Sequence, residues 1–586
     1  MRFIINLTGA LMMVSMAFSA CNNNKAIDAD TNQKFEKFTK RFIEKLWEIN
    51  PVWASGVGYH KYDSKLPIPG EENRQIQQLF ASNYLDSISR FDVERLDDAH
   101  RIDLLMLKNM LEESLWNLNE FRDFEWNPSN FNIAGALSAI LHEQYAPLDE
   151  RLKSLYEKIS HVPAYYRGAK KNIIHPTKIH TQLSIDQNEG SLTILQNDLA
   201  DSVINSGLND SLKKVFSIRI DSASMAVQDY IDWLRDTILP GLDDLGRDFR
   251  IGQALYTAKF KFEMISHYSA EQIYQKSLRA RDSVQQEMIK LTESIWDNYF
   301  DVSPDVFDLK SVKTMLNTLS ANHVPADSFE KSITTLLPKL SQFVSDHNLL
   351  WMDPQKPLKV RQTPAYMRGI SIASCSSPGP YDKNGNTYYN VDPMNDFGRE
   401  QTESLLREYN RWMMQILSIH EAIPGHYAQL VYANESPSLI KSLFGNNTMI
   451  EGWACYAERF MLENGYGKHQ AEMMLMYNKW LLRIICNTIL DYGVHVKAMS
   501  KEEAMDLLIN QAFQEPSEAE GKWRRVSVSQ VQLDSYFTGL TEILALREAW
   551  KKQEGNNYSL KVFNEKFLSY GSAPVKYIRE LMLTKE

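Results

Sequence analysis

Hydrophobic residues recur at helical spacing along most of the chain. Phe38, Phe42 and Leu46 are an example, because residues four positions apart lie on one face of a helix. The same pattern predicts helices over residues 35–50, 72–92, 94–118, 135–146, 148–173, 191–206, 211–237, 269–298, 303–320, 328–347, 400–423, 449–464, 468–498, 501–513, 530–550, 558–569 and 573–584. The fold is therefore expected to be mainly α.

The pattern changes after residue 354, where three prolines indicate a loop. Residues 365–374 and 387–391 then favour strands, separated by the Gly-, Pro- and Asn-rich segment 376–386, which predicts a small β-hairpin. This hairpin precedes the predicted helix over 400–423. Its edge either pairs with an extended peptide through backbone hydrogen bonds or only covers the core, and the sequence leaves both alternatives open.

Composition and charge limit the classes of function. The 586 residues are 44% hydrophobic and 24% charged, which is typical of a soluble globular protein with a large core. No clear linker divides residues 35–586, so we expect a single helical domain there. The net charge is −10, so no basic field covers the chain and nucleic acid is not expected as a partner.

The N-terminus has the features of a bacterial lipoprotein signal. A basic start at Arg2 precedes a mostly apolar run over residues 3–17, and small residues then precede Cys21. We therefore expect a signal peptide over 1–21, a lipid anchor on Cys21 and a polar, flexible tether over 22–34. This places the protein in the bacterial cell envelope, membrane-anchored on the periplasmic or outer-membrane face. A plain signal peptide and an uncleaved helix are the alternatives.

Two histidines flank a glutamate in the stretch from His420 to His426. Zinc binds imidazole nitrogen, and the common zinc helix carries two histidines four residues apart, with a glutamate beside the first. Here the histidines are six residues apart, which on an unbroken helix would turn the second by about 240° from the first. Pro424 and Gly425 lie between them and favour a local break. Such a break would return His426 to the side of His420.

A third ligand is expected about one helix later. Glu451 follows His426 by 25 residues, and Glu458 lies seven residues further on, two turns along the same helix face. This spacing suits a ligating carboxylate at Glu451. It also suits a second carboxylate, Glu458, that orients a ligating histidine.

These two motifs, residues 420–426 and 451–458, resemble the bacterial domain-of-unknown-function 885 (DUF885) family, many members of which are lipoproteins. Supporting stretches occur at 58–63, 491–495, 532–539 and 546–547, and the resemblance spans roughly residues 36–580. The family is in turn distantly similar to gluzincin metallopeptidases of the carboxypeptidase Taq and thimet oligopeptidase type. That similarity implies a large multi-helix fold with a deep cleft and the small sheet near the active site.

The resemblance also implies roles for individual residues. His420, His426 and Glu451 would hold one Zn²⁺, and Glu421 would act as general base. Tyr536 and His495 are the candidates for stabilising the oxyanion, although a core tyrosine and a buried structural histidine are equally good interpretations. Arg525 and Arg547 are candidates for binding a substrate carboxylate, with structural ion pairs as the alternative. 

Three functions are compatible with this set of residues. The first is a zinc-dependent metallopeptidase that acts on short peptides, as a carboxypeptidase or oligopeptidase. The second is a metal-dependent hydrolase of another amide or ester. The third is a non-catalytic surface lipoprotein that binds peptides on the same scaffold.

Overall fold

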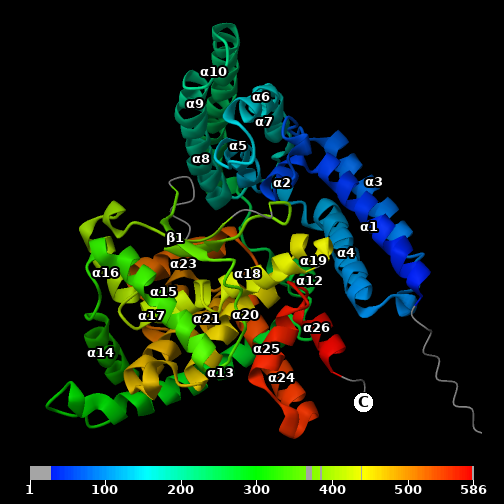
Figure 1. The fold of residues 1–586 in the computed structure, drawn as a ribbon. Coiled ribbons are helices and arrows are strands. Elements are labelled where there is room, and N and C mark those ends of the chain that lie inside the picture. The colour runs from blue at the N-terminus through cyan, green and yellow to red at the C-terminus, as the bar shows by residue number, and fades with distance from the viewer. Residues whose placement is uncertain (1–27, 365–371, 383–385, 437, 584–586) are drawn as a thin grey trace, which may run out of the picture.

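The computed structural model describes residues 28–364, 372–382, 386–436 and 438–583. The predicted signal peptide and Cys21 lie outside these residues. Within them the protein is mainly α, as predicted, with one small sheet (Figure 1). In the described part of the chain, no helix is both long enough and apolar enough to span a membrane.

The helices fall into three groups along the chain (Figure 1). The N-terminal group is α1 (Ala29–Ile49), α2 (Pro51–Gly56), α3 (Glu71–Ile88) and α4 (Asp98–Trp116). A second group forms the lobe at the top of Figure 1 and consists of α5 (Ala134–Leu141), α6 (Leu148–Ile159), α7 (Val162–Asn172), α8 (Lys178–Thr193), α9 (Ala200–Ile204) and α10 (Asp210–Asp232). The remaining helices are α11 (Leu242–Leu245), α12 (Gly252–Met264), α13 (Ala270–Ile295), α14 (Leu309–Ser320), α15 (Phe329–Asp346), α16 (Arg399–Glu408), α17 (Met413–Glu421), α18 (His426–Glu435), α19 (Leu439–Leu443), α20 (Asn447–Glu463), α21 (Ala471–Lys497), α22 (Lys501–Asp506), α23 (Pro516–Val528), α24 (Asp534–Glu554), α25 (Leu560–Leu568) and α26 (Val575–Met582).

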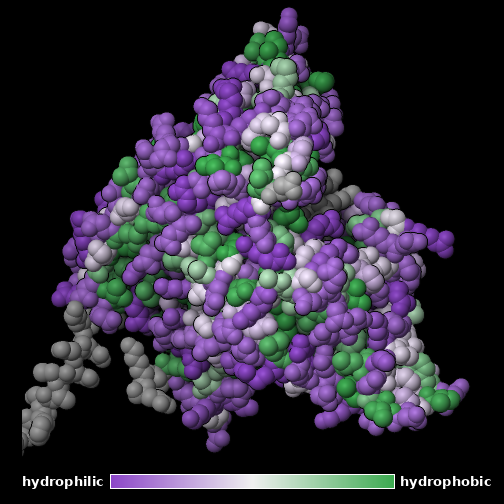
Figure 2. Space-filling view, turned by 180° about the vertical axis from the view of Figure 1, so that it is seen from behind, coloured by the Kyte–Doolittle hydropathy of each residue, from purple (hydrophilic) through white to green (hydrophobic). Residues whose placement is uncertain are grey.

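Two separate hydrophobic cores hold these groups together. The lobe has its own core, in which Leu152, Leu195 and Phe216 are fully buried. The larger core joins the N-terminal helices to the C-terminal body and includes Trp47 and Trp453. The predicted single domain therefore contains two hydrophobic cores. Figure 2 shows that the face opposite to that of Figure 1 is mostly hydrophilic, with hydrophobic residues in small groups.

The predicted tether is shorter than expected. Residues 29–34 belong to α1, so the prediction of a flexible segment up to residue 34 is wrong for this part. Asp28 caps the helix by accepting from the Asp30 N–H at 3.0 Å. The Asn32 amide donates to Asp97 at 2.9 Å, which fixes the first turn to the start of α4. Local capping thus orders a polar stretch that has few hydrophobic residues.

Two long predicted helices are each divided in two. The pattern over 148–173 is interrupted between α6 and α7, where Pro163 stands in the first turn of the second helix. The pattern over 400–423 is interrupted between α16 and α17. There the Asn410 side chain accepts from the backbone N–H groups of Trp412 and Met413 at 3.1 and 3.3 Å, which starts the new helix.

The sheet has three strands, β1 (Leu358–Gln362), β2 (Ala373–Ser376) and β3 (Thr387–Val391), in the order β1-β3-β2. The strand predicted over 387–391 is confirmed as β3, which pairs antiparallel with β2 and parallel with β1. Residues 365–371 of the other predicted strand lie outside the described residues. The prediction of a loop over 354–364 is wrong for β1, because pairing with β3 extends the backbone between the prolines.

Residues 58–63 connect the N-terminal helices, the lobe and the loop after β2. The buried Asp63 accepts from the Ser55 hydroxyl at 2.5 Å and lies 3.0 Å from His60 Nδ1. The His60 ring stacks on Tyr145, which precedes α6 in the lobe. A Cβ on Gly379 would lie 2.2 Å from the Val57 carbonyl oxygen, so the loop after β2 packs tightly against this stretch. The stretch therefore has a structural role.

Candidate metal centre

The chain breaks between the two histidines, as predicted from Pro424 and Gly425. Helix α17 ends at Glu421, and α18 begins at His426. The Gly425 N–H donates a hydrogen bond to the Ile419 carbonyl at 2.9 Å. A Cβ on Gly425 would lie 1.9 Å from the His420 carbonyl oxygen, so only glycine fits here. The two histidines therefore stand on different helices that meet at a tight, glycine-dependent connection.

The three predicted ligands lie together in the structure. Glu451 Oε2 is 3.6 Å from His420 Nε2 and 3.4 Å from His426 Nε2. The two imidazole rings are nearly perpendicular, with centroids 4.8 Å apart. Each residue thus directs one ligand atom to a common point, and these atoms are all within 4.8 Å of one another.

The donor set fits a zinc ion. In the described part of the chain, no donor forms a hydrogen bond with the buried Glu451 Oε2. A buried carboxylate oxygen that accepts no hydrogen bond is unfavourable unless a cation binds it. In a tetrahedral zinc site, ligand bonds of 2.0 to 2.2 Å place neighbouring ligand atoms about 3.4 Å apart. The distances from Glu451 Oε2 to both imidazole nitrogens match this separation, and two histidines with one carboxylate suit zinc.

Glu458 lies behind His420, as its spacing from Glu451 predicted. Its Oε1 is 2.6 Å from His420 Nδ1 and also accepts from Trp480 Nε1 of α21 at 2.8 Å. A hydrogen bond at Nδ1 fixes the tautomer that leaves a lone pair on Nε2, which is the nitrogen directed at Glu451. Trp480 was not predicted from the sequence, because a tryptophan in a buried helix gives no separate signal.

Cys455 offers a second grouping with His420 and Glu458, on the Nδ1 side of the ring. Burial raises the pKa of the Cys455 thiol to about 12, so the thiol stays protonated at neutral pH. Only the thiolate is a good metal ligand. The set of His420, His426 and Glu451 is therefore the better candidate.

Glu421 stands at the end of α17, directly after His420. Its carboxylate is half-buried and lies beside the backbone of Cys375 in the edge strand β2. Burial raises the pKa of Glu421, against the opposing effect of the nearby histidines. Strand β2 packs against α17, so the sheet lies beside the predicted general base.

Tyr536 reaches the centre from α24. Its ring stacks on His420 with a centroid separation of 6.3 Å, and its hydroxyl accepts from Arg525 Nη2 at 3.3 Å. The same Arg525 nitrogen donates to Gln532 Oε1 at 2.7 Å. Burial raises the pKa of Tyr536 to about 12, so the hydroxyl remains a donor at neutral pH. Tyr536 and the exposed Arg525 thus both lie beside the candidate ligands.

His495 does not join this group. Its Nε2 lies 2.9 Å from the Val526 carbonyl and 3.0 Å from the Ser529 carbonyl, and both hold the end of α23. Four residues earlier, Asp491 accepts from the Val531 and Leu533 N–H groups at 2.9 and 3.1 Å. The prediction of a catalytic His495 is therefore corrected to a structural role. The sequence indicated a role for the 491–495 stretch but not that it fixes the connection that leads to Tyr536.

Arg547 forms a structural ion pair, which was the alternative to substrate binding. Its Nη1 donates to Glu463 Oε2 at 2.8 Å, and its guanidinium lies 5.4 Å from the centre of the Tyr456 ring. Glu463 is the last residue of α20, three turns beyond Glu451. This arrangement corrects the prediction that Arg547 binds substrate and leaves Arg525 as the candidate.

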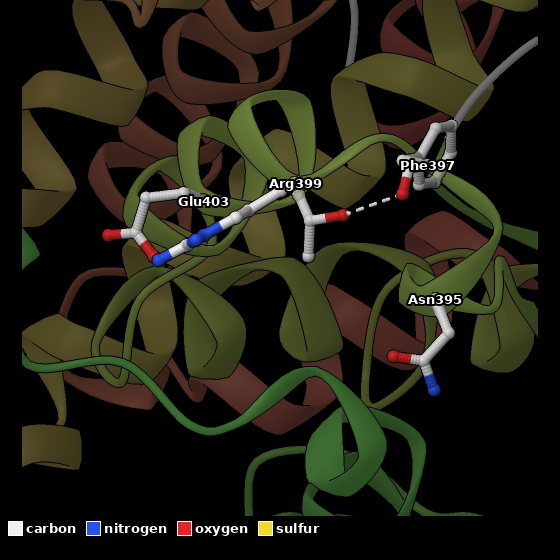
Figure 3. Close-up of a pocket in the computed structure, with 5 residues that line it drawn as sticks. Asn395, Phe397, Arg399 and Glu403 are labelled. Carbon is white, nitrogen blue, oxygen red and sulfur yellow. Dashed lines mark hydrogen bonds between the residues drawn. The ribbon is translucent and has the colours of Figure 1, made fainter.

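A separate shallow pocket lies between β3 and α16 and is lined by Asn395, Phe397, Arg399, Thr402 and Glu403 (Figure 3). The Thr402 hydroxyl donates to the Phe397 carbonyl across its wall at 3.2 Å. None of the predicted site residues lines it. The chemistry therefore concentrates at the candidate metal centre.

Comparison with known protein families identifies the family of this chain. Residues 51–582 match a family described as "Bacterial protein of unknown function (DUF885)". No curated protein matches the chain. Among solved structures, a "putative lipoprotein of unknown function" from Shewanella oneidensis shares 46% identity over 94% of this chain and 100% of its own, with a TM-score of 0.86. A "putative lipoprotein" from Colwellia psychrerythraea, at 15% identity, shares the fold over 94% of this chain and 98% of its own, with a TM-score of 0.77. The chain therefore belongs to the DUF885 family of bacterial proteins of unknown function.

Proposed function

We propose that this protein is a zinc-dependent metallopeptidase that hydrolyses short peptides. The observation that carries the proposal is the buried Glu451 Oε2, which accepts no hydrogen bond from the described residues and lies between two imidazole nitrogens, with Glu421 at the next position after one of the histidines. A zinc ion held by His420, His426 and Glu451 would supply Lewis-acid activation of water and of the substrate carbonyl. A gluzincin-like mechanism follows from this arrangement.

Each neighbouring residue has a role in such a reaction. Glu421 accepts the proton of the attacking water and transfers it to the leaving amine. The Tyr536 hydroxyl donates a hydrogen bond to the oxyanion as negative charge develops there. Glu458 and Trp480 keep the His420 ring in one orientation. Arg525 is the exposed cation beside Tyr536 and binds a carboxylate of the substrate, such as a peptide C-terminus.

The proposed location is the bacterial cell envelope. The small residues before Cys21 support a lipid anchor there, and the relative from Shewanella is described as a "putative lipoprotein". Anchoring through Cys21 would hold the enzyme on the periplasmic or outer-membrane face. Two alternatives use the same scaffold. A hydrolase of another amide or ester would use the same catalytic residues, whereas a peptide-binding lipoprotein without catalytic activity would not need them for chemistry.

The test begins with metal analysis of the protein purified with zinc available, which should show one zinc per chain. The Glu421→Gln variant should then keep its zinc and lose peptide hydrolysis by about 100-fold or more. Glu400→Gln is the matched control, because it removes an exposed carboxylate on α16. Full activity in Glu421→Gln, or no bound metal in the wild type, would overturn the proposal. Cleavage of esters or other amides but not of peptides would favour the second function.

A further inference from the structure

A second cavity includes in its lining Asn447, which lies one helical turn before Glu451 on α20. Its volume is about 530 Å³, and it lies between α4, the end of α12, the start of α20 and the connection that precedes α24. Its lining combines aromatic walls, side-chain amides, two carboxylates and the ammonium group of Lys259, which pairs with one of the carboxylates. The residues used below are Trp53, Phe444, Glu113, Glu263, Asn447 and Gln532.

Two lining residues connect the cavity to the metal centre. Asn447 is exposed at the start of α20, four residues before Glu451, so it lies about 6 Å away along the helix axis. Gln532 accepts from the Arg525 nitrogen that also donates to the Tyr536 hydroxyl. An extended peptide advances about 3.3 Å per residue. A group one or two residues from the reacting bond therefore reaches this cavity.

The cavity is suited to a positive charge. Glu113 is half-buried, and in the described part of the chain its carboxylate has no hydrogen bond or ion pair, whereas the Glu263 carboxylate pairs with Lys259. Burial and the nearby Glu263 raise the pKa of Glu113 to about 7, against the opposing effect of Lys259, so a cation bound beside Glu113 would favour its ionised form. The C-terminal end of α12 also points here, since Phe262 and Ile265 line the cavity. The carbonyl end of a helix carries partial negative charge, which favours a cation.

Aromatic rings form part of the wall. Trp53 and Phe444 pack edge to face, with centroids 5.5 Å apart, and Trp53 keeps 38% of its surface exposed. An aromatic face attracts an ammonium or guanidinium group, and it also packs on the methylene groups of a lysine or arginine side chain. The cavity thus offers both an anionic end and an apolar wall.

We propose that this cavity is a specificity subsite that receives an ammonium or guanidinium group of the peptide substrate, with Glu113 as its ionic partner. The inference rests on the proposed peptidase function and names the substrate class. The cation comes from a lysine or arginine side chain or from the free N-terminal amine of a short peptide. The two sources share the same chemistry, and the choice of peptides separates them.

The experiment measures kcat/KM on matched short peptides with zinc-loaded protein. One series places lysine, norleucine or glutamate at each position beside the reacting bond. A second series compares free and acetylated N-termini. The wild type should prefer the cationic peptide by about tenfold. Glu113→Gln should lose this preference without losing activity on norleucine peptides, and Glu113→Lys should reverse it toward glutamate.

Glu112→Gln is the matched control, because Glu112 is the neighbouring residue of α4 and its side chain is exposed. It should keep the full preference. A wild type that cleaves peptides without preferring a cation overturns the cavity assignment and leaves the peptidase function standing. A preference for the cationic peptide that persists in Glu113→Gln also overturns the cavity assignment and leaves the peptidase function standing.

Binding to the Glu421→Gln background separates failure of the two proposals. Calorimetry should show that the lysine peptide binds about tenfold more tightly than the norleucine peptide, and that Glu113→Gln removes the difference. If this holds while the wild type cleaves none of the peptides, the peptidase function fails and the cavity assignment stands.

Discussion

Gly452 of α20 and Gly539 of α24 are in direct contact where the two helices cross. A Cβ on Gly452 would lie 2.5 Å from the Gly539 Cα, and a Cβ on Gly539 would lie 1.9 Å from the Thr448 carbonyl oxygen. Glu451 precedes the first glycine, and Tyr536 lies one turn before the second. The absence of two side chains therefore brings a candidate ligand and a candidate catalytic hydroxyl into the same site.

Gly539→Ala should destabilise the protein, because the added methyl group meets backbone atoms that cannot move independently. The expected loss in unfolding free energy is about 1–3 kcal/mol or more. Gly521→Ala is the control, since Gly521 lies inside α23 and a Cβ there meets nothing within 4 Å. That variant should be stabilised by about 0.5–1 kcal/mol. Chemical denaturation measures both, and equal stability of the two variants would contradict the contact.

Glu458→Gln should weaken zinc binding by about 10- to 100-fold, because the carboxylate that orients the His420 ring becomes a neutral amide. Competition with a chelator measures the affinity. Glu463→Gln, on the same helix, removes the partner of Arg547 instead. It should leave the zinc affinity unchanged. Similar losses in the two variants would indicate general damage to α20 rather than orientation of the ligand.

Tyr536→Phe should lower kcat by about 100-fold while zinc stays bound, since it removes a protonated hydroxyl beside the candidate ligands. His495→Gln provides the contrast. A glutamine amide retains a donor toward the Val526 and Ser529 carbonyls, so this variant should keep most of its activity. Steady-state kinetics distinguishes the two, and equal kcat values in Tyr536→Phe and the wild type would exclude an oxyanion role for Tyr536.

Arg525→Ala should raise KM by about tenfold for peptides with a free C-terminus and change KM little for C-terminally amidated peptides. Its guanidinium is exposed beside Tyr536. Arg547→Ala should leave KM unchanged and lower the melting temperature, because its partner is Glu463. A comparison of KM on paired free and amidated peptides tests the assignment. Identical effects on both kinds of peptide would show that Arg525 does not bind the carboxylate.

His180 should make folding sensitive to acid. The ring is buried, and its Nε2 is 3.2 Å from the Val528 carbonyl oxygen. Burial lowers the pKa of His180 from 6.5 to about 4. Below pH 6.5 the unfolded chain gains a proton that the folded protein does not, so stability falls as pH decreases toward 4. The shift corresponds to about 3 kcal/mol at most. His180→Gln should show a shallower decrease in denaturation midpoint between pH 7 and 4.5, and the exposed His161→Gln should match the wild type.

The sequence predicted the parts of the site that depend on spacing. The break at Pro424 and Gly425 and the seven residues from Glu451 to Glu458 are local properties, because helix geometry alone relates them. The helix pattern and β3 were predicted for the same reason. Hydrophobic periodicity indicates which face of a helix or strand is buried, and most helices of this chain bury one face.

The missed features depend on contacts between distant segments. Strand β1 pairs with β3 across about 29 residues, and nothing in its own sequence distinguishes it from a proline-rich loop. The proximity of Cys375 to Glu421 and the hydrogen bonds that Asp491 accepts from Val531 and Leu533 depend on tertiary packing. Arg547 and His495 were assigned to the site because their motifs resemble those of the family. A motif can be retained for its structural role, and only the contacts distinguish that role from catalysis.

The glycine at position 425 has a consequence for recognising similar sites in other sequences. The usual zinc motif is His-Glu-x-x-His, in which the second histidine follows the first by four residues. This chain has six residues from the first histidine to the second, so a search for the usual motif would miss it. Residue 425 lies so close to the His420 carbonyl that it must be glycine. The alternative motif therefore needs a glycine directly before the second histidine, where one helix ends and the next begins. A search built on that backbone constraint, with the Glu-x6-Glu pair downstream, would select chains that can close the same site.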